Sequence, residues 1–114
     1  MSGITTHVLD TAAGRPARGV AVRLEVQSGP RGWVALAERT TDGDGQVRDL
    51  LAEGARLDPG TYRLTFGTGD YFKAQGQATF FPEASVVFEV REAGQHHHVP
   101  LLLSPFGYST YRGS

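Results

Sequence analysis

The stretch of the sequence that decides the expected fold is HVPLLLSPFGYSTYRGS, residues His98–Ser114. Its apolar run, Val99–Leu103, is typical of a buried strand, and Ser104–Gly107 contains the Pro and Gly that mark a turn. The polar and aromatic run Tyr108–Arg112 then predicts a last strand. Because chain ends are usually frayed, we expect an ordered, polar end such as this one to take part in function.

Strand-like runs separated by turns continue over the rest of the chain. Val20–Val26 alternates apolar even positions with mostly polar or small odd positions, which predicts a strand with one buried and one solvated face. Asp42–Gly45 lacks the further acidic ligands of a calcium loop, so it predicts a hairpin turn. The expected strands are Ile4–Asp10, Val20–Val26, Trp33–Thr41, Gln46–Leu51, Thr61–Phe66, Val86–Val90, Gln95–Leu103 and Tyr108–Arg112.

Short strands with turns about every 8–12 residues predict an antiparallel β-sandwich. The one helix expected is short: Thr68 or Asp70 caps it, and Tyr71–Gln75 forms its turns before Gly76. Pro100 has no backbone N–H, so we expect its strand to lie at a sheet edge or to contain a bulge. The aromatic residues expected in core or helix packing are Trp33, Tyr62, Phe66, Tyr71, Phe72 and Phe88, with Phe80 and Phe81 also buried.

Composition limits the classes of protein to which the chain can belong. The 114 residues are expected to form one domain, residues 1–114, around a single core. The absence of Cys excludes disulfides and suits a reducing compartment, and the first residues show no signal peptide, so we expect a cytoplasmic protein. A net charge of -1 gives no support for nucleic-acid binding, and no apolar run is long enough for a membrane span.

Four histidines are the first candidates for chemistry: His7, His96, His97 and His98. On a regular strand His96 and His98 share one face and His97 takes the other, so the triplet cannot converge on one metal ion. His7, His96 and His98 would together supply three imidazoles, but no acidic cluster completes an obvious site. Three interpretations stay open: a metal site, a solvated strand end, and a catalytic or binding group.

Three motifs of the chain resemble the 5-hydroxyisourate hydrolases, the transthyretin-related enzymes of urate breakdown. They are Thr6–Asp10, Phe80–Glu83 and His98–Ser114, so the resemblance covers nearly the whole chain. It implies an all-β, transthyretin-like antiparallel β-sandwich of two four-stranded sheets, with one short helix after the fifth strand. It also implies a homotetramer, a dimer of dimers, with active sites in the channel between dimers. Neither a cofactor nor a metal is implied, and the implied partner is a small purine-derived substrate.

The reaction implied by the resemblance adds water to a ring carbonyl of 5-hydroxyisourate and opens the six-membered ring. The product is 2-oxo-4-hydroxy-4-carboxy-5-ureidoimidazoline. In this family the residues matching His7 and His98 project into the channel, where they position and deprotonate water, and an imidazole titrates near neutrality. Tyr111 would stack on the planar substrate, and Ser114 would add its hydroxyl and carboxylate. Arg112 falls on the opposite face from Tyr111 and is expected to be structural or interface-forming.

The main departure from the family follows the Asp42–Gly45 turn. The family usually has Arg directly after Asp-Gly, as a clamp for a substrate oxygen, whereas this chain has Gln46 there and Arg48 two residues later. On a regular strand both side chains project to one face, about 6.6 Å apart along the strand. Three interpretations stay open: Arg48 replaces the missing guanidinium, Gln46 binds the substrate as a neutral amide, or the chain is a degraded enzyme.

Two other classes of function compete with the enzyme. The same fold in transthyretin carries hydrophobic ligands without hydrolysing them, so a small-ligand carrier is the alternative, and Gln46 is the feature that favours it. A generic adhesion or scaffold sandwich is the third class, because fold alone does not establish function. The channel lining separates these classes: two His, a Tyr and a nearby Arg suit a small polar heterocycle.

Overall fold

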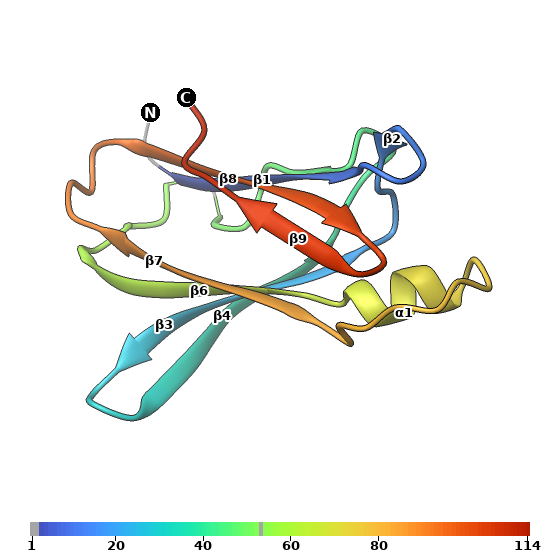
Figure 1. Cartoon of the computed structure of the whole chain (residues 1–114). Coiled ribbons are helices and arrows are strands. Elements are labelled where there is room, and N and C mark those ends of the chain that lie inside the picture. Colours follow the sequence, from blue (N-terminus) through green and yellow to red (C-terminus); the bar gives the residue numbers. More distant parts are fainter. Residues whose placement is uncertain (1–2, 53) are drawn as a thin grey trace.

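The structure is a computed structural model that describes residues 3–52 and 54–114. Two sheets lie face to face, and a short helix sits beside one end of them (Figure 1). The first sheet has the order β2-β1-β8-β9, with β5 also paired to β1, and the second has the order β4-β3-β6-β7. The elements are β1 (Gly3–Asp10), β2 (Arg15–Pro16), β3 (Ala21–Ser28), β4 (Gly32–Thr40), β5 (Gln46–Val47), β6 (Gly60–Phe66), α1 (Thr68–Lys73), β7 (Ala84–Val90), β8 (His96–Ser104) and β9 (Gly107–Thr110).

The predicted transthyretin-like sandwich with one short helix is confirmed, with two differences in the first sheet. This sheet has five strands, because Arg15–Pro16, which lies between the expected strands Ile4–Asp10 and Val20–Val26, pairs with the end of β1 as β2. The ladder between β1 and β8 is parallel, whereas the other strand pairs described are antiparallel. Strands far apart in the sequence are therefore direct neighbours at the centre of this sheet.

The core lies between the inner faces of the two sheets. Strand β1 shows the pattern clearly, since its even-numbered residues are buried and its odd-numbered residues are only partly buried. Burying each large apolar side chain contributes about 1.5–3 kcal/mol, so this cluster is the main source of stability. The largest fully buried side chains are Phe66, Phe72, Ile4, Leu24, Leu50, Leu64, Leu101, Leu103, Val8, Val20, Val22 and Val90.

The strand predicted over Gln46–Leu51 is only two residues long. It pairs with β1 at Gln46 and Val47 and then leaves the ladder. Val47 and Leu50 are both buried, at 3% and 1% exposure. A spacing of three residues cannot put two side chains on the same face of a regular strand. The chain therefore turns inward after Val47, so that Leu50 reaches the core.

Of the two alternatives predicted for Pro100, a sheet edge or a bulge, the edge strand is wrong, because β8 lies between β1 and β9. The missing N–H is tolerated because the ladder on the β9 side is interrupted there. Strand β9 ends at Thr110, opposite Leu101, and pairing resumes only at a single bridge between Gly113 and His98. Pro100 lies in this gap, and its carbonyl accepts a hydrogen bond from the Thr110 hydroxyl at 2.7 Å.

Helix α1 is in the predicted place, but its N-terminal cap differs from the prediction. The N-cap is Gly67 and makes no side-chain cap bond, so Thr68 and Asp70 lie within the first turn. Thr68 is buried, and its hydroxyl donates to the backbone oxygen of Phe81 at 3.3 Å. The start of the helix is thus anchored to the loop that precedes β7. Among the residues described, no helix has the length and apolar character that crossing a membrane requires.

Most aromatic residues predicted for the core pack there, but Trp33, Phe80 and the half-buried Phe81 lie outside the core cluster. Phe80 is 72% exposed and packs edge-on against Phe81, with ring centroids 5.0 Å apart. Trp33 lies outside the core cluster, and the guanidinium of Arg63 sits 4.3 Å from its ring centroid. The aromatic residues that are buried in the core or packed against it are Tyr62, Phe66, Phe72, Tyr71 and Phe88.

A buried carboxylate connects the end of β1 to the helix. Asp10 is 1% exposed, and its two oxygens accept hydrogen bonds from the Tyr71 hydroxyl at 2.8 Å and the Ala13 N–H at 2.9 Å. A buried charge is tolerated only when such partners replace water. Desolvation raises the pKa of the Tyr71 phenol, and the hydrogen bond to Asp10 raises it further, so the phenol stays a donor.

His97 is the histidine that faces inward, as the period-two pattern predicted. It is 5% exposed, and its Nδ1 has no hydrogen-bond partner in the described part of the chain. Burial lowers the pKa of His97 below its ordinary value, and the charge of Arg112 lowers it further. The folded protein therefore favours the neutral imidazole.

Replacing Tyr71 with Phe should lower the free energy of unfolding by about 1–3 kcal/mol, because Asp10 loses a donor without gaining water. Urea denaturation followed by circular dichroism measures this difference. Tyr108→Phe is the matched control, because Tyr108 is 38% exposed and its hydroxyl can be hydrated. Equal stability of the two variants would contradict the role given to the Asp10 contact.

Replacing His97 with Phe should reduce the loss of stability on acidification. The unfolded imidazole titrates near pH 6.5 and the folded one at lower pH, so the unfolded chain binds more protons between these values. Stability is therefore present above about pH 6.5 and lost as the pH falls toward the folded pKa. Urea midpoints at about pH 7.5 and about pH 5 should differ less in His97→Phe than in the wild type. An equal fall of the urea midpoint between the two pH values in both proteins would show that His97 contributes nothing to the loss of stability in acid.

Candidate active site

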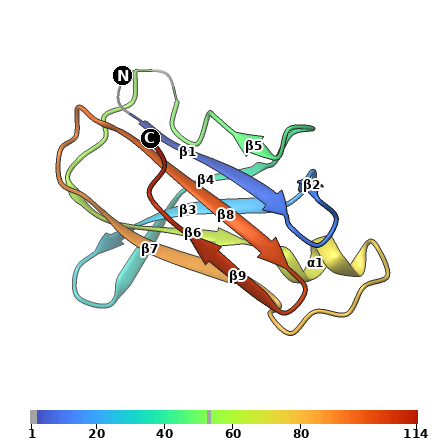
Figure 2. The same ribbon diagram turned by 45° about the horizontal axis from the view of Figure 1, so that its top comes forward.

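The outer face of the first sheet carries the histidines that the sequence singled out. Strands β1 and β8 run side by side (Figure 2), with Thr5 opposite His98 and His7 opposite Pro100. Because paired residues point to the same face of a sheet, Thr5, His7 and His98 share the outer face. His96 lies two residues before His98 on β8, so it belongs to the same face.

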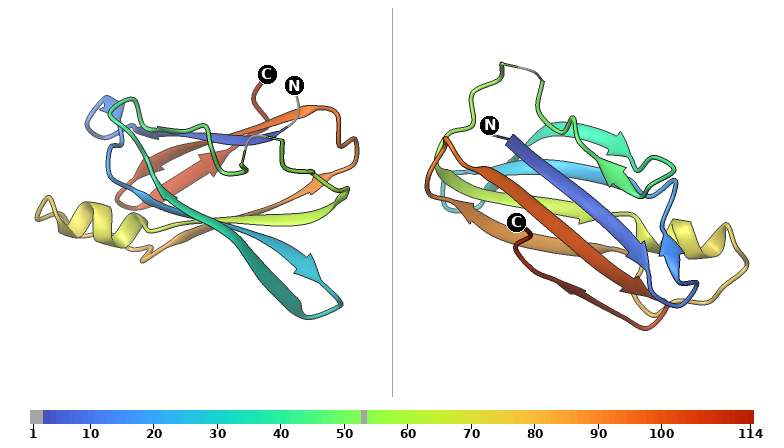
Figure 3. Two further views of the ribbon diagram at one scale, coloured as in Figure 1. Left: turned by 180° about the vertical axis from the view of Figure 1, so that it is seen from behind. Right: turned by 90° about the horizontal axis from the view of Figure 1, so that it is seen from above.

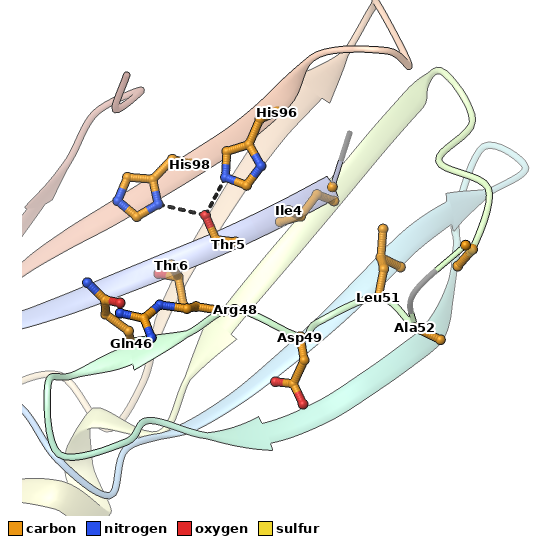
Figure 4. A pocket seen from close by; sticks show the side chains of 13 residues that line it. Ile4, Thr5, Thr6, Gln46, Arg48, Asp49, Leu51, Ala52, His96 and His98 are labelled. Atoms are coloured by element: carbon orange, nitrogen blue, oxygen red, sulfur yellow. Dashed lines mark hydrogen bonds between the residues drawn. The ribbon is translucent and has the colours of Figure 1, made fainter. Parts of the chain in front are cut away.

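A threonine hydroxyl joins two of these imidazoles. Oγ1 of Thr5 lies 2.8 Å from Nε2 of His96 and 2.7 Å from Nδ1 of His98 (Figure 4). The two imidazole rings are nearly parallel, with centroids 6.4 Å apart. The sequence pattern correctly placed His96 and His98 on one face. It gave no sign of Thr5, because a parallel partner 93 residues away leaves no local signal.

A cavity of about 880 Å³ adjoins this cluster, and two more predicted site residues line it. Thr5, His96 and His98 contribute from β1 and β8, while Gln46 and Arg48 lie on the other side of β1 (Figure 4). Gln46 and Arg48, which were predicted to share one face of a strand, both line this cavity, although Arg48 lies beyond the end of β5. The hydrogen-bond donors Gln46 and Arg48 thus line the same cavity as the imidazoles of His96 and His98.

His7 does not line this cavity, although it lies on the same face. It is in register with Gln46 on one side and with Pro100 on the other. His7 is half-buried, and its charge is close enough to lower the pKa of both Asp42 and His98. The structure therefore brings His7 next to the cavity.

The turn before β5 fixes the position of Gln46. The Asp42 carboxylate accepts hydrogen bonds from the N–H groups of Asp44 at 2.9 Å and Gln46 at 3.0 Å. The bond from Gln46 is the largest cause of the lowered pKa of Asp42. Gly45 has a φ of +74°, and a Cβ there would collide with the backbone oxygen of Val8. The turn forms where it was predicted, but it is not a hairpin, because β4 and β5 belong to different sheets; it brings β5 tightly against β1 instead.

Arg48 is available to a ligand in the cavity. Within the described part of the chain, the ion pairs engage other arginines, and none involves Arg48. The neighbouring carboxylate of Asp49 lies 3.6 Å from Nε of Arg39 instead. The guanidinium therefore forms no ion pair with a described side chain, although its charge is close enough to lower the pKa of Asp42.

The C-terminal segment folds back over β8 on the outer side of the first sheet (Figures 1 and 3). The N–H of Gly113 donates to the carbonyl of His98 at 2.8 Å. A Cβ on Gly113 would lie 2.5 Å from Cδ2 of His98 and 3.3 Å from Cγ of Pro100. Only glycine permits this approach, which brings Ser114, the next residue, to the neighbourhood of the His98 ring.

Tyr111 lies on the other side of His98 from Arg48. A second cavity of about 240 Å³ is lined by Tyr111 and His98 together with residues of β7. Tyr111 is 56% exposed, so its ring can meet a ligand or another chain. Arg112 lines this second cavity as well, and its guanidinium donates to the side-chain oxygen of Gln95 at 3.0 Å, a contact of the structural kind predicted for it.

The environment of His98 favours its uncharged form. Burial lowers the pKa of His98 below its ordinary value, and the charges of His96 and His7 lower it further. A neutral imidazole can accept a proton at neutral pH. Among the residues described, no group of three or more His, Cys, Asp or Glu is arranged to hold a metal ion. His96 and His98 instead share Thr5, and His97 faces the core.

Comparisons with known proteins agree with these features. A profile of the HIUase/Transthyretin family matches residues 4–113. The chain is 50% identical to the 5-hydroxyisourate hydrolase of Caulobacter vibrioides over 119 residues, which cover 100% of each chain.

Two solved structures show that the fold is shared by proteins with different names. A Klebsiella pneumoniae 5-hydroxyisourate hydrolase superposes with a TM-score of 0.84 at 39% identity, covering 97% of this chain and 98% of the other. Sea bream transthyretin in complex with thyroxine superposes with a TM-score of 0.90 at 34% identity, covering 96% of this chain and 93% of the other. From the matched profile, the near-complete coverage and the shared sandwich, we conclude that the chain belongs to the HIUase/Transthyretin family.

Proposed function

We propose that this chain is an enzyme that hydrolyses 5-hydroxyisourate to 2-oxo-4-hydroxy-4-carboxy-5-ureidoimidazoline in urate catabolism. The observation that carries the proposal is one cavity that holds His98, whose pKa is lowered, together with Gln46 and Arg48. An imidazole can accept a proton from water, and amide or guanidinium groups can stabilise a developing oxyanion. Similarity to proteins named 5-hydroxyisourate hydrolase supports this reaction.

In the proposed mechanism, His98 takes a proton from water while the water oxygen bonds to a ring carbonyl carbon. The ring C–N bond then breaks, and the imidazolium returns the proton to the leaving nitrogen. His7 orients the water, a role supported by its place on the same face beside Gln46. General acid–base catalysis of this kind contributes about 10²–10⁴ in rate.

We assign the oxyanion contact to Arg48. Its side chain lines the same cavity as His98, and no described ion pair neutralises it. A guanidinium binds an anionic oxygen more strongly than an amide does, because its hydrogen bonds are charge-assisted. Gln46 is the alternative donor, held beside β1 by the Asp42 turn. In this arrangement Gln46 contacts the neutral substrate, and Arg48 acts on the charge that develops.

Tyr111 and Ser114 are assigned to substrate binding. The contact of Gly113 with the His98 ring supports this, because it holds the segment containing both residues beside the imidazole. The planar Tyr111 ring can stack on a planar heterocycle, and the Ser114 hydroxyl can donate or accept a hydrogen bond.

The assembly proposed is a homotetramer, a dimer of dimers. The candidate site lies on a sheet face that one chain leaves open, with Tyr111 56% exposed. A single sheet face encloses a small polar substrate poorly, so a second copy covering this face is physically sensible. The edge strand β7 also exposes Val87, at 57%, where another chain can pack.

A non-catalytic carrier is the second candidate, because a transthyretin in complex with thyroxine has nearly the same fold. Fold does not separate the two candidates, but the lining of the site does. His96, His98 and Arg48 at one cavity suit a small polar heterocycle better than an apolar ligand.

Two further predictions from the sequence remain part of this proposal. The core shared by both sheets supports a one-domain organisation of residues 1–114. A cytoplasmic location fits the sequence without cysteine.

The wild-type protein should accelerate the ultraviolet decay of freshly generated 5-hydroxyisourate, and His98→Ala should lower kcat/KM by about 10²-fold or more, because the proton acceptor is lost. His97→Phe is the matched control, since it changes the adjacent imidazole on the inner face and should keep most of the activity. No acceleration by the wild type at micromolar protein would reject the enzyme and leave the carrier.

Arg48→Ala should lower kcat/KM by about 10²-fold, the usual effect of removing one oxyanion donor, whereas Gln46→Ala should cost less than about tenfold. Gln46→Arg should then give little further gain, because Arg48 already supplies the guanidinium. Arg91→Ala, at a side chain 84% exposed, controls for loss of positive charge. A larger loss in Gln46→Ala than in Arg48→Ala would assign the oxyanion contact to the amide.

A further inference from the structure

The hydroxyl of Thr5 lies between two imidazole nitrogens, and its hydrogen-bonding chemistry limits which of the two rings can donate to it. Oγ1 lies 2.8 Å from Nε2 of His96 and 2.7 Å from Nδ1 of His98, and both distances are those of good hydrogen bonds (Figure 4). A hydroxyl has one proton to donate and two lone pairs to accept with. Thr5 can therefore donate to only one of the two rings, and the other ring must donate to it.

The direction of these two hydrogen bonds determines which nitrogen of His98 is free. If Thr5 donates to Nδ1 of His98, the neutral ring carries its proton on Nε2 and cannot accept another there. If His98 donates from Nδ1 to Thr5, then Nε2 has a free lone pair, and Thr5 donates onward to Nε2 of His96. Neutral imidazoles commonly have their tautomer set by the partner of the second nitrogen in this way.

Neighbouring parts of the chain hold the His98 ring in place for its hydrogen bond with Thr5. The parallel ladder fixes Thr5 opposite His98, and Gly113 packs against the Cδ2 edge of the ring. The charged and titratable groups around His98 come from every element beside it: His96 and His97 on the same strand, His7 on β1, Arg48 and Asp49 after β5, Glu89 on β7, and Tyr111 and Arg112 in the C-terminal segment.

We propose that Thr5 is a positioning residue that accepts the Nδ1 proton of His98 and donates to Nε2 of His96, which leaves Nε2 of His98 as the proton acceptor. The inference rests on the proposed function and deepens it, because it assigns the accepting atom. When Nε2 takes a proton from water, the hydrogen bond from Nδ1 to Thr5 is kept. No side chain then has to turn during the reaction.

Thr5→Val is the main test, because it removes the hydroxyl and keeps the shape of the side chain. We expect kcat/KM to fall by about tenfold or more, because part of the acid–base contribution is lost. The acidic limb of the pH profile should also move to lower pH, since the imidazolium of His98 loses an acceptor. Thr5→Ser keeps the hydroxyl, so its kcat/KM and the acidic limb of its pH profile should be close to those of the wild type. Thr40→Val on the exposed strand β4 should change neither kcat/KM nor the acidic limb.

Nitrogen-15 NMR of the imidazoles reports the tautomer without any need for activity. In the wild type at about pH 7.5, His98 should show a protonated Nδ1 and an unprotonated Nε2. In Thr5→Val the two tautomers should mix. In His96→Phe the hydroxyl of Thr5 loses its other acceptor, so it should donate to His98 and move the proton to Nε2.

These measurements separate failure of the inference from failure of the proposed function. An inactive wild type that still shows the Nδ1-protonated form of His98 would reject the proposed function and keep the hydrogen-bond assignment. A wild type with its proton on Nε2, or a Thr5→Val variant with unchanged kcat/KM and unchanged nitrogen-15 shifts, would overturn the inference.

Discussion

The parallel ladder between β1 and β8 is the constraint on which the candidate site depends. It sets Thr5 opposite His98 and His7 opposite Pro100. Four polar side chains from two distant segments therefore meet on one face: Thr5, His7, His96 and His98. A slip of one residue would turn every side chain of one strand to the other face. The inner faces resist such a slip, because Ile4 and Val8 on β1 and Leu101 on β8 are buried in the same core.

The site is held from three directions by parts of the chain that pack closely on this ladder. Gly45 lets the turn before β5 approach the backbone of Val8, which places Gln46 beside β1. Gly113 lets the C-terminal segment lie against His98. On the inner side, the hydroxyl of Thr6 donates to the carbonyl of Val99 and ties the two strands together under the site. Rigid support of this kind keeps catalytic groups in a working geometry.

Adjacent histidines on opposite faces of β8 show how position decides the role of one residue type. His97 points into the core, where its Nδ1 has no partner among the described residues and its neutral form is favoured mainly by burial, with a further contribution from the charge of Arg112. His98 points outward, where its Nδ1 has Thr5 as a partner and its side chain lines two cavities. Both have a lowered pKa, and the proposed reaction uses the neutral form of His98 only.

The sequence by itself determined the strands with regular alternation, the turn at Asp42–Gly45, and the division of His96–His98 between two faces, because these follow from local periodicity and local hydrogen bonding. Only the tertiary structure decided that β1 and β8 pair in parallel, that Leu50 bends the chain away from β5, and that Thr5 bridges two imidazoles. Each of these results depends on contacts between residues far apart in the chain. Packing and ladder formation select such contacts among many alternatives, and no pattern within one segment encodes the choice.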